Sequence, residues 1–84
     1  MDMYEHWRKC ISKLLRESNP DASDYLIKRG TNCLIRKYYD EDPIKALASA
    51  TFEELFKTRH VGEKTMQILL NAQIIAREIV KERK

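Results

Sequence analysis

The chain has 84 residues, of which 43% are hydrophobic and 35% are charged, and its formal net charge is +3. This balance excludes an intrinsically disordered chain and is sufficient for one small domain with a single core. The two glycines and two prolines are too few for a turn-rich β fold, and the positive charge permits a nucleic-acid partner without requiring one.

The first predicted helix covers residues 3–17, with Asp2 as its N-cap. Its apolar residues recur at helical spacing, which predicts one buried face. The segment 18–23, SNPDAS, contains Asn-Pro and Asp and is therefore expected to be a turn. The apolar residues of this first helix are Met3, Tyr4, Trp7, Cys10, Ile11, Leu14 and Leu15.

Residues 23–30 are expected to form a short apolar anchor that ends at Gly30. Residues 31–39 then fit a second helix with Thr31 as its N-cap. The apolar residues of the anchor are Tyr25, Leu26 and Ile27, and the side chains expected to face inward in the helix are Cys33, Leu34, Ile35 and Tyr38.

Three more helices complete the prediction. Asp42 followed by Pro43 is a helix start, so residues 43–50 form a short third helix carrying Ile44 and Leu47. Thr51 and Glu54 fit a capping box that begins a fourth helix ending near residue 57 or 58. A long fifth helix is expected over residues 63–82. The expected inward residues are Phe52, Leu55 and Phe56 in the fourth helix, and Met66, Leu69, Leu70, Ala72, Gln73, Ile75, Ala76, Ile79 and Val80 in the fifth.

Cys10 and Cys33 form neither a Cys-x-x-Cys pair nor a cluster with histidine, so reduced thiols are expected and metal binding is not. The N-terminal residues lack the apolar segment of a signal peptide, and no run reaches membrane-span length. We therefore expect a cytoplasmic location. No nucleophile–base set or carboxylate pair indicates an enzyme, and no cofactor is expected.

Gly62 lies between two predicted helices, within the sequence KTRHVGEKTMQILL. A glycine turn that leads directly into a helix can aim backbone N–H groups at an anion, and DNA carries phosphates on its outside. Two short blocks, RGTNCL and TFEELFKTRHVGEKTMQIL, extend this pattern. Together they resemble the C-terminal domain of the bacterial RNA polymerase alpha subunit, which has a helix-hairpin-helix-like core.

The resemblance covers residues 29–70 and implies a compact all-α domain whose first block opens a helix. On this basis residues 24–84 correspond to the core, and residues 1–23 form an extra N-terminal helix and turn within a single five-helix domain. The loop YYDEDP is longer than in that family, and the large assembly domain of the alpha subunit is absent. His60 stands where a helix-hairpin-helix motif usually has glycine.

The family's domain binds the minor groove of A·T-rich DNA and also contacts activators and sigma factor. The resemblance therefore implies DNA contacts in this chain at Arg29, Asn32, Cys33, Gly62, Lys64 and Thr65. Physical chemistry agrees, because a narrow minor groove attracts arginine and a helix N-terminus attracts phosphate.

Each of these residues also has an ordinary structural explanation. Arg29 fits a solvated surface charge, Asn32 a cap near Thr31, and Cys33 a core residue. The turn itself could require Gly62, and Lys64 with Thr65 could be an exposed first turn.

Two functions follow from the sequence. The first is a non-catalytic DNA-binding module in transcription that contacts the minor groove and phosphates of A·T-rich DNA. The alternative is a protein-interaction module that binds RNA polymerase, sigma factor or a regulator without DNA. The sequence specifies neither the target site nor the oligomeric state.

Overall fold

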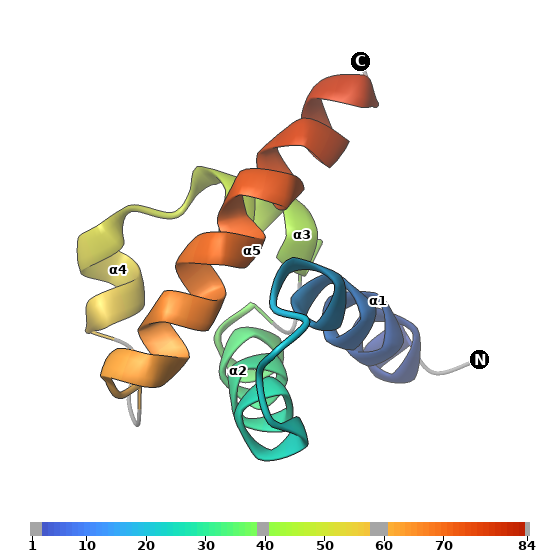
Figure 1. Ribbon diagram of the computed structural model, residues 1–84. Helices are drawn as coiled ribbons and strands as arrows, with labels where there is room; N and C mark the ends of the chain where they lie inside the picture. The colour runs from blue at the N-terminus through green and yellow to red at the C-terminus, as the bar shows by residue number, and fades with distance from the viewer. Residues whose placement is uncertain (1–2, 39–40, 58–60, 84) are drawn as a thin grey trace.

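Helix α5, Glu63–Glu82, crosses the middle of the molecule and contacts each of the other four helices (Figure 1). The computed structural model describes residues 3–38, 41–57 and 61–83. Within these ranges the chain forms α1 (Met3–Ser18), α2 (Asp24–Lys37), α3 (Pro43–Ser49), α4 (Phe52–Phe56) and α5, without a strand. The all-α prediction is confirmed. Asp2 and His60, to which the sequence assigned a cap and a turn position, lie outside the described residues.

The helices begin where the sequence offers side-chain caps. Ser23 accepts a hydrogen bond from the Leu26 amide at 3.3 Å, and Asp42 accepts from the Ile44 amide at 3.0 Å. The Thr51 hydroxyl accepts from the Glu54 amide at 3.1 Å, which is one of the two hydrogen bonds of the predicted capping box. Each cap satisfies an amide that the helix itself cannot, so α2, α3 and α4 begin at defined residues.

One core joins the helices. Its fully buried side chains include Ile11 and Leu15 of α1, so the N-terminal helix is an integral part of the core. Other members from four helices are Ile27, Leu34, Ile35, Leu47, Leu55, Leu69, Ala72 and Ala76. These are mostly the residues that helical spacing predicts to be inward.

Hydrogen bonds of two buried amide side chains join the ends of α1 and α3 to α5. Asn19, just after α1, donates to the Ile68 carbonyl at 3.1 Å and accepts from Asn71 at 2.9 Å. Gln73 donates to the carbonyls of Leu47 and Ala50 at 2.9 and 2.7 Å. Because buried amides are costly to leave unpaired, these bonds fix how α1 and α3 dock.

Gly30 does not end a helix, and Thr31 is not an N-cap; both predictions are wrong. Helix α2 runs without interruption through both residues, and the Thr31 hydroxyl donates back to the Ile27 carbonyl at 2.8 Å. Gly30 is buried where three helices meet. A Cβ there would lie 3.2 Å from Leu15 Cδ1 and 3.5 Å from Leu69 Cδ2. The glycine therefore serves close helix packing, which a single sequence does not distinguish from helix termination.

Two aromatic residues predicted to face inward, and a third in the predicted apolar anchor, are exposed. Phe52 and Phe56 are 56% and 63% exposed, and Tyr25 is 67% exposed. Helix α4 has five residues and buries only Leu55, so its other apolar side chains point outward. Tyr25 lies on the solvent side of the first turn of α2, whereas Ile27 faces the core.

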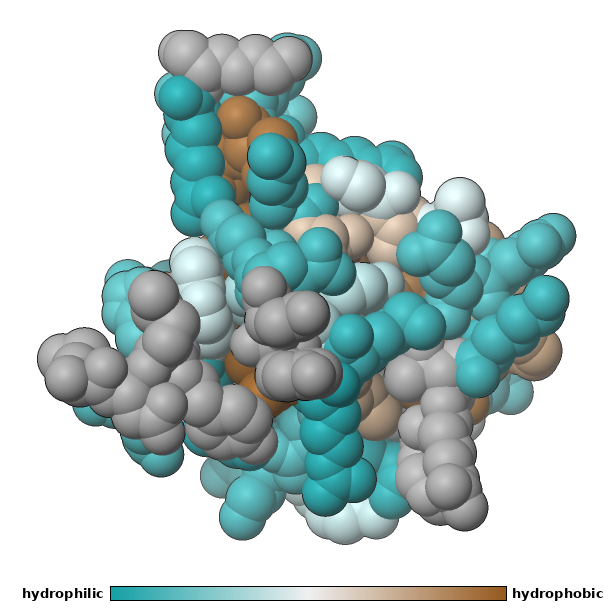
Figure 2. Space-filling model, turned by 180° about the vertical axis from the view of Figure 1, so that it is seen from behind, coloured by the Kyte–Doolittle hydropathy of each residue, from teal (hydrophilic) through white to brown (hydrophobic). Residues whose placement is uncertain are grey.

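None of the described helices has the length and apolar character needed to cross a membrane. Seen from behind, the surface is largely hydrophilic, and hydrophobic atoms show mainly between charged side chains (Figure 2). That face therefore presents no broad apolar area among the residues described.

Replacing Gly30 by leucine is expected to destabilise the protein by about 2 kcal/mol, because overpacking at the helix crossing outweighs the gain in helix propensity. Gly62→Ala is the matched control. A Cβ at Gly62 would meet nothing within 4 Å, so only the poorer N-cap preference of alanine remains, and the cost should be about 1 kcal/mol or less. Urea denaturation followed by circular dichroism measures both changes. Equal stability of the Gly30→Leu variant and the unmodified protein would contradict the packing role.

Candidate nucleic-acid interface

The first two turns of α2 and the first turn of α5 line a shallow hollow of about 480 Å³. Helix α2 contributes Tyr25, Leu26 and Arg29, and α5 contributes its N-cap, Gly62, and the three residues that follow. Segments more than thirty residues apart in sequence thus share one surface. Four of the six predicted DNA-binding residues line this hollow: Arg29, Gly62, Lys64 and Thr65.

A neighbouring tyrosine orients Arg29. The Arg29 guanidinium donates to the Tyr25 hydroxyl at 3.0 Å, across one turn of α2. The tyrosine is mostly exposed and the arginine is half-buried, so the pair lies at the rim of the hollow. A flat aromatic ring beside a guanidinium is a surface suited to sugar and phosphate groups.

The N-terminus of α5 supplies the second half of the surface. Gly62 is its N-cap, and among the described residues no side-chain cap of this helix is found. The first amides of a helix have no partner within the helix, so those of Glu63, Lys64 and Thr65 are available to an anion, with the helix dipole adding a partial positive charge.

The backbone conformation does not require glycine at residue 62. Its φ of −87° and ψ of 177° are accessible to any residue, which contradicts the structural explanation that the turn needs glycine. The open space around its Cα leaves room for another group to approach the backbone. Close approach of a phosphate is the remaining explanation from the sequence, and it stays a prediction.

The side chains after Gly62 differ in accessibility. Lys64 is exposed and can meet a phosphate directly. Glu63 is also exposed in this hollow, and its negative charge would repel a phosphate. Thr65 is only 2% exposed and is therefore mainly a packing residue of the first turn.

Asn32 and Cys33 do not line the hollow. The Asn32 side-chain oxygen accepts a 2.7 Å hydrogen bond from Arg8 of α1, so this side chain faces α1. Both residues lie in the middle of α2, whereas the resemblance implies that their block opens a helix. The helix beginning that lies near Gly62 is the one at Asp24, not at Thr31.

The Cys33 thiol is half-buried. Burial raises its pKa above the ordinary value, and the positive charges of Arg29 and Arg36 oppose that rise. The neutral thiol is therefore the dominant form near neutral pH. A half-buried neutral thiol is consistent with the core-residue explanation of Cys33.

Sequence reasoning missed Tyr25 and Arg8. The spacing of Tyr25 and Arg29, one helical turn apart, could have indicated their contact once one continuous helix was assumed. The bond between Arg8 and Asn32 joins residues from different helices, and no local pattern indicates it.

Comparisons with protein-family models, curated proteins and solved structures found no match to this chain. Among the described residues, no group of three or more histidine, cysteine or acidic side chains is placed to hold a metal ion.

In a Cys10→Ser variant, alkylation of Cys33 by iodoacetamide should rise with pH around a midpoint above that of the unfolded chain, because the thiolate is the reactive form. By linkage, the stability contributed by the neutral thiol is fully present below the unfolded-state pKa and is lost as pH rises through the higher folded-state pKa. Rates measured against pH with and without concentrated urea test this. A folded-state midpoint at or below the unfolded one would contradict the raised pKa.

Proposed function

We propose that this protein is a non-catalytic DNA-binding module that contacts the minor groove and phosphates of A·T-rich DNA. The observation that carries the proposal is the shared hollow, which Arg29 of α2 lines together with Gly62, the N-cap of α5, and the first turn of that helix. A cationic side chain and a row of backbone donors on one surface match the way proteins hold the DNA backbone.

The two halves of the hollow have different roles in this proposal. Arg29 enters the narrow minor groove of an A·T-rich tract, where the negative potential is strongest. The amides after Gly62 and the ammonium of Lys64 bind an adjacent phosphate. If ~3–5 phosphates are neutralised, log Kd depends on log salt with a slope of magnitude about 3–5.

The role in transcription rests on the resemblance of residues 29–70 to the C-terminal domain of the RNA polymerase alpha subunit. Asn32 and Cys33 do not line the hollow, so the resemblance does not extend to DNA contacts at these two residues. In our proposal the DNA contacts are made chiefly by Arg29, Gly62 and Lys64, whereas Asn32 joins α2 to α1 through Arg8. A cytoplasmic location follows from the same proposal.

Fluorescence anisotropy with an A·T-rich duplex should give a Kd of ~10⁻⁴–10⁻⁶ M, as expected for mainly backbone contacts.

Arg29→Ala should weaken binding about tenfold, because a charge-assisted contact is lost. Lys64→Ala should reduce the magnitude of the salt slope by about 1. Glu63→Gln should strengthen binding about threefold, because it removes the opposing charge in the hollow.

Lys81→Ala is the matched control. Lys81 is exposed and lies on the same helix as Lys64, about 25 Å away at the helical rise, which exceeds a Debye length of about 10 Å. Its loss should change Kd less than twofold. Equal losses for Arg29→Ala, Lys64→Ala and Lys81→Ala would indicate diffuse charge attraction and would exclude the proposed surface.

A second candidate function is a protein-interaction module that binds RNA polymerase, sigma factor or a regulator. The observation that favours it is the exposed aromatic pair on α4. The rings of Phe52 and Phe56 stack with centroids 5.8 Å apart, and both side chains are more than half exposed. Exposed aromatic side chains of this kind are typical anchors of protein interfaces.

For the second candidate, the double substitution F52S/F56S should abolish binding to purified bacterial RNA polymerase in biolayer interferometry, while Arg29→Ala retains it. Because both rings are exposed, the helical content of the double variant should match that of the unmodified protein. Polymerase binding that survives the double substitution would exclude α4 as the contact.

A further inference from the structure

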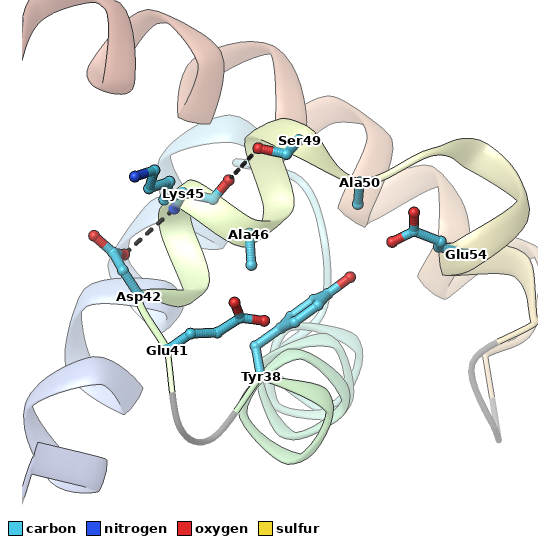
Figure 3. Close-up of a pocket in the computed structure, with 8 residues that line it drawn as sticks. All are labelled: Tyr38, Glu41, Asp42, Lys45, Ala46, Ser49, Ala50 and Glu54. Carbon is cyan, nitrogen blue, oxygen red and sulfur yellow. Dashed lines mark hydrogen bonds between the residues drawn. The ribbon is translucent and has the colours of Figure 1, made fainter.

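A second hollow, of about 520 Å³, lies between the C-terminal end of α2, one face of α3 and Glu54 of α4 (Figure 3). It shares no lining residue with the proposed DNA surface. Its volume falls in the range of small-molecule sites. The residues that line it are Tyr38, Glu41, Asp42, Lys45, Ala46, Ser49, Ala50 and Glu54.

The buried hydroxyl of Tyr38 is the feature of this hollow that a ligand would satisfy. Tyr38 is only 8% exposed, and its hydroxyl oxygen is the single buried side-chain polar atom in the described part of the chain without a hydrogen-bond partner. In Figure 3 this hydroxyl points into the hollow, towards the side of Ala50 and Glu54. Buried polar groups are nearly always paired, so the hydroxyl marks a place for an external partner.

The charge of the hollow selects a cation. In Figure 3 the Glu54 carboxylate lies on the side to which the Tyr38 hydroxyl points, and the Glu41 carboxylate lies beside the Tyr38 ring. Burial raises the pKa of Tyr38 most, and the charges of Glu54 and Glu41 raise it further. The Asp42 carboxylate instead caps α3 and binds Arg83 at 2.7 Å. The Lys45 ammonium points away from Tyr38.

The shape and lining of the hollow favour an organic cation over a metal ion. The residues described in the structure contain no cluster of ligands for a metal. The hollow is also larger than one ion needs, and Ala46, Ala50 and the Tyr38 ring give it an apolar part. A primary alkylammonium has three N–H donors, which match the carboxylates and the hydroxyl, and an alkyl chain, which matches the apolar part of the hollow.

We propose that this hollow binds a primary alkylammonium group. The ammonium donates a hydrogen bond to the Tyr38 hydroxyl oxygen and lies between the carboxylates of Glu41 and Glu54, while the alkyl chain packs against Ala46 and Ala50. A free amine and the lysine side chain of a partner present this same chemistry. The site is independent of DNA binding.

Chemical-shift titration of the Ala46 and Ala50 methyl groups with butylammonium tests the proposal. Saturable shifts should appear at these two methyls, while butanol and butyrate, which match its length, should produce none. An Nα-acetyl-lysine methylamide that binds more tightly than butylammonium would assign the natural ligand to a protein lysine, and weaker binding would assign it to a free amine. No saturable shift with either amine, or equal shifts with butanol, would overturn the proposal.

Matched variants locate the contacts. Tyr38→Phe should weaken butylammonium binding about fivefold and Glu41→Gln about threefold, because each removes one interaction with the cation. Tyr25→Phe and Glu78→Gln, which alter an exposed tyrosine and an exposed glutamate elsewhere, should leave the affinity unchanged. Unchanged affinity in Tyr38→Phe would overturn the proposal.

The melting temperature of Tyr38→Phe gives an independent check. Removing a hydroxyl that lacks a partner should leave the melting temperature equal or higher, since the apolar replacement has the same shape. A clear decrease would show that the hydroxyl has a partner within the protein, and would also overturn the proposal.

Discussion

The close packing of α2 against α1 and α5 at Gly30 is the constraint on which the rest of the structure depends. A Cβ there would lie 3.2 Å from Leu15 Cδ1 and 3.5 Å from Leu69 Cδ2, so any larger side chain would force the three helices or their leucines to shift. Helix α2 continues through this crossing. It begins at Asp24, seven residues before Thr31, where the sequence predicted a helix to begin. Its first turn then lies beside the first turn of α5, and the hollow between them follows from the packing.

The same core separates two surfaces of opposite character. Arg29 and Lys64 line the hollow at the starts of α2 and α5, and Glu41 and Glu54 line the hollow around Tyr38. The net charge of +3 conceals this division, because it sums over acidic and basic groups that lie apart. Glu63 is an exception, because its carboxylate lies within the cationic hollow. At this place in the first turn of α5 the carboxylate is stabilised by the helix dipole. Binding at each surface therefore depends on local charge more than on the total.

Helical periodicity and capping chemistry were sufficient to predict most of the fold. The bounds of α1, α3 and α5 and the buried face of α5 follow from apolar spacing and from local start signals such as Asp42–Pro43. The prediction failed at Gly30, because burial against other helices is a non-local property. It also failed at Phe52 and Phe56, since the short α4 buries Leu55 alone. For the site, the sequence indicated Arg29, Gly62 and Lys64 but not Tyr25, and the unpaired hydroxyl of Tyr38 could be found only in three dimensions.

The most direct test of the proposed DNA surface is an amide ¹H–¹⁵N spectrum of the protein titrated with an A·T-rich duplex. We expect the largest shift changes at Tyr25, Arg29 and residues 62–65, because these form the shared hollow. The amides of Glu41 and Ala46, at the other hollow, should remain unchanged. Changes centred on α4 or on the hollow around Tyr38, or no saturable change at any amide, would contradict DNA binding at the joined starts of α2 and α5.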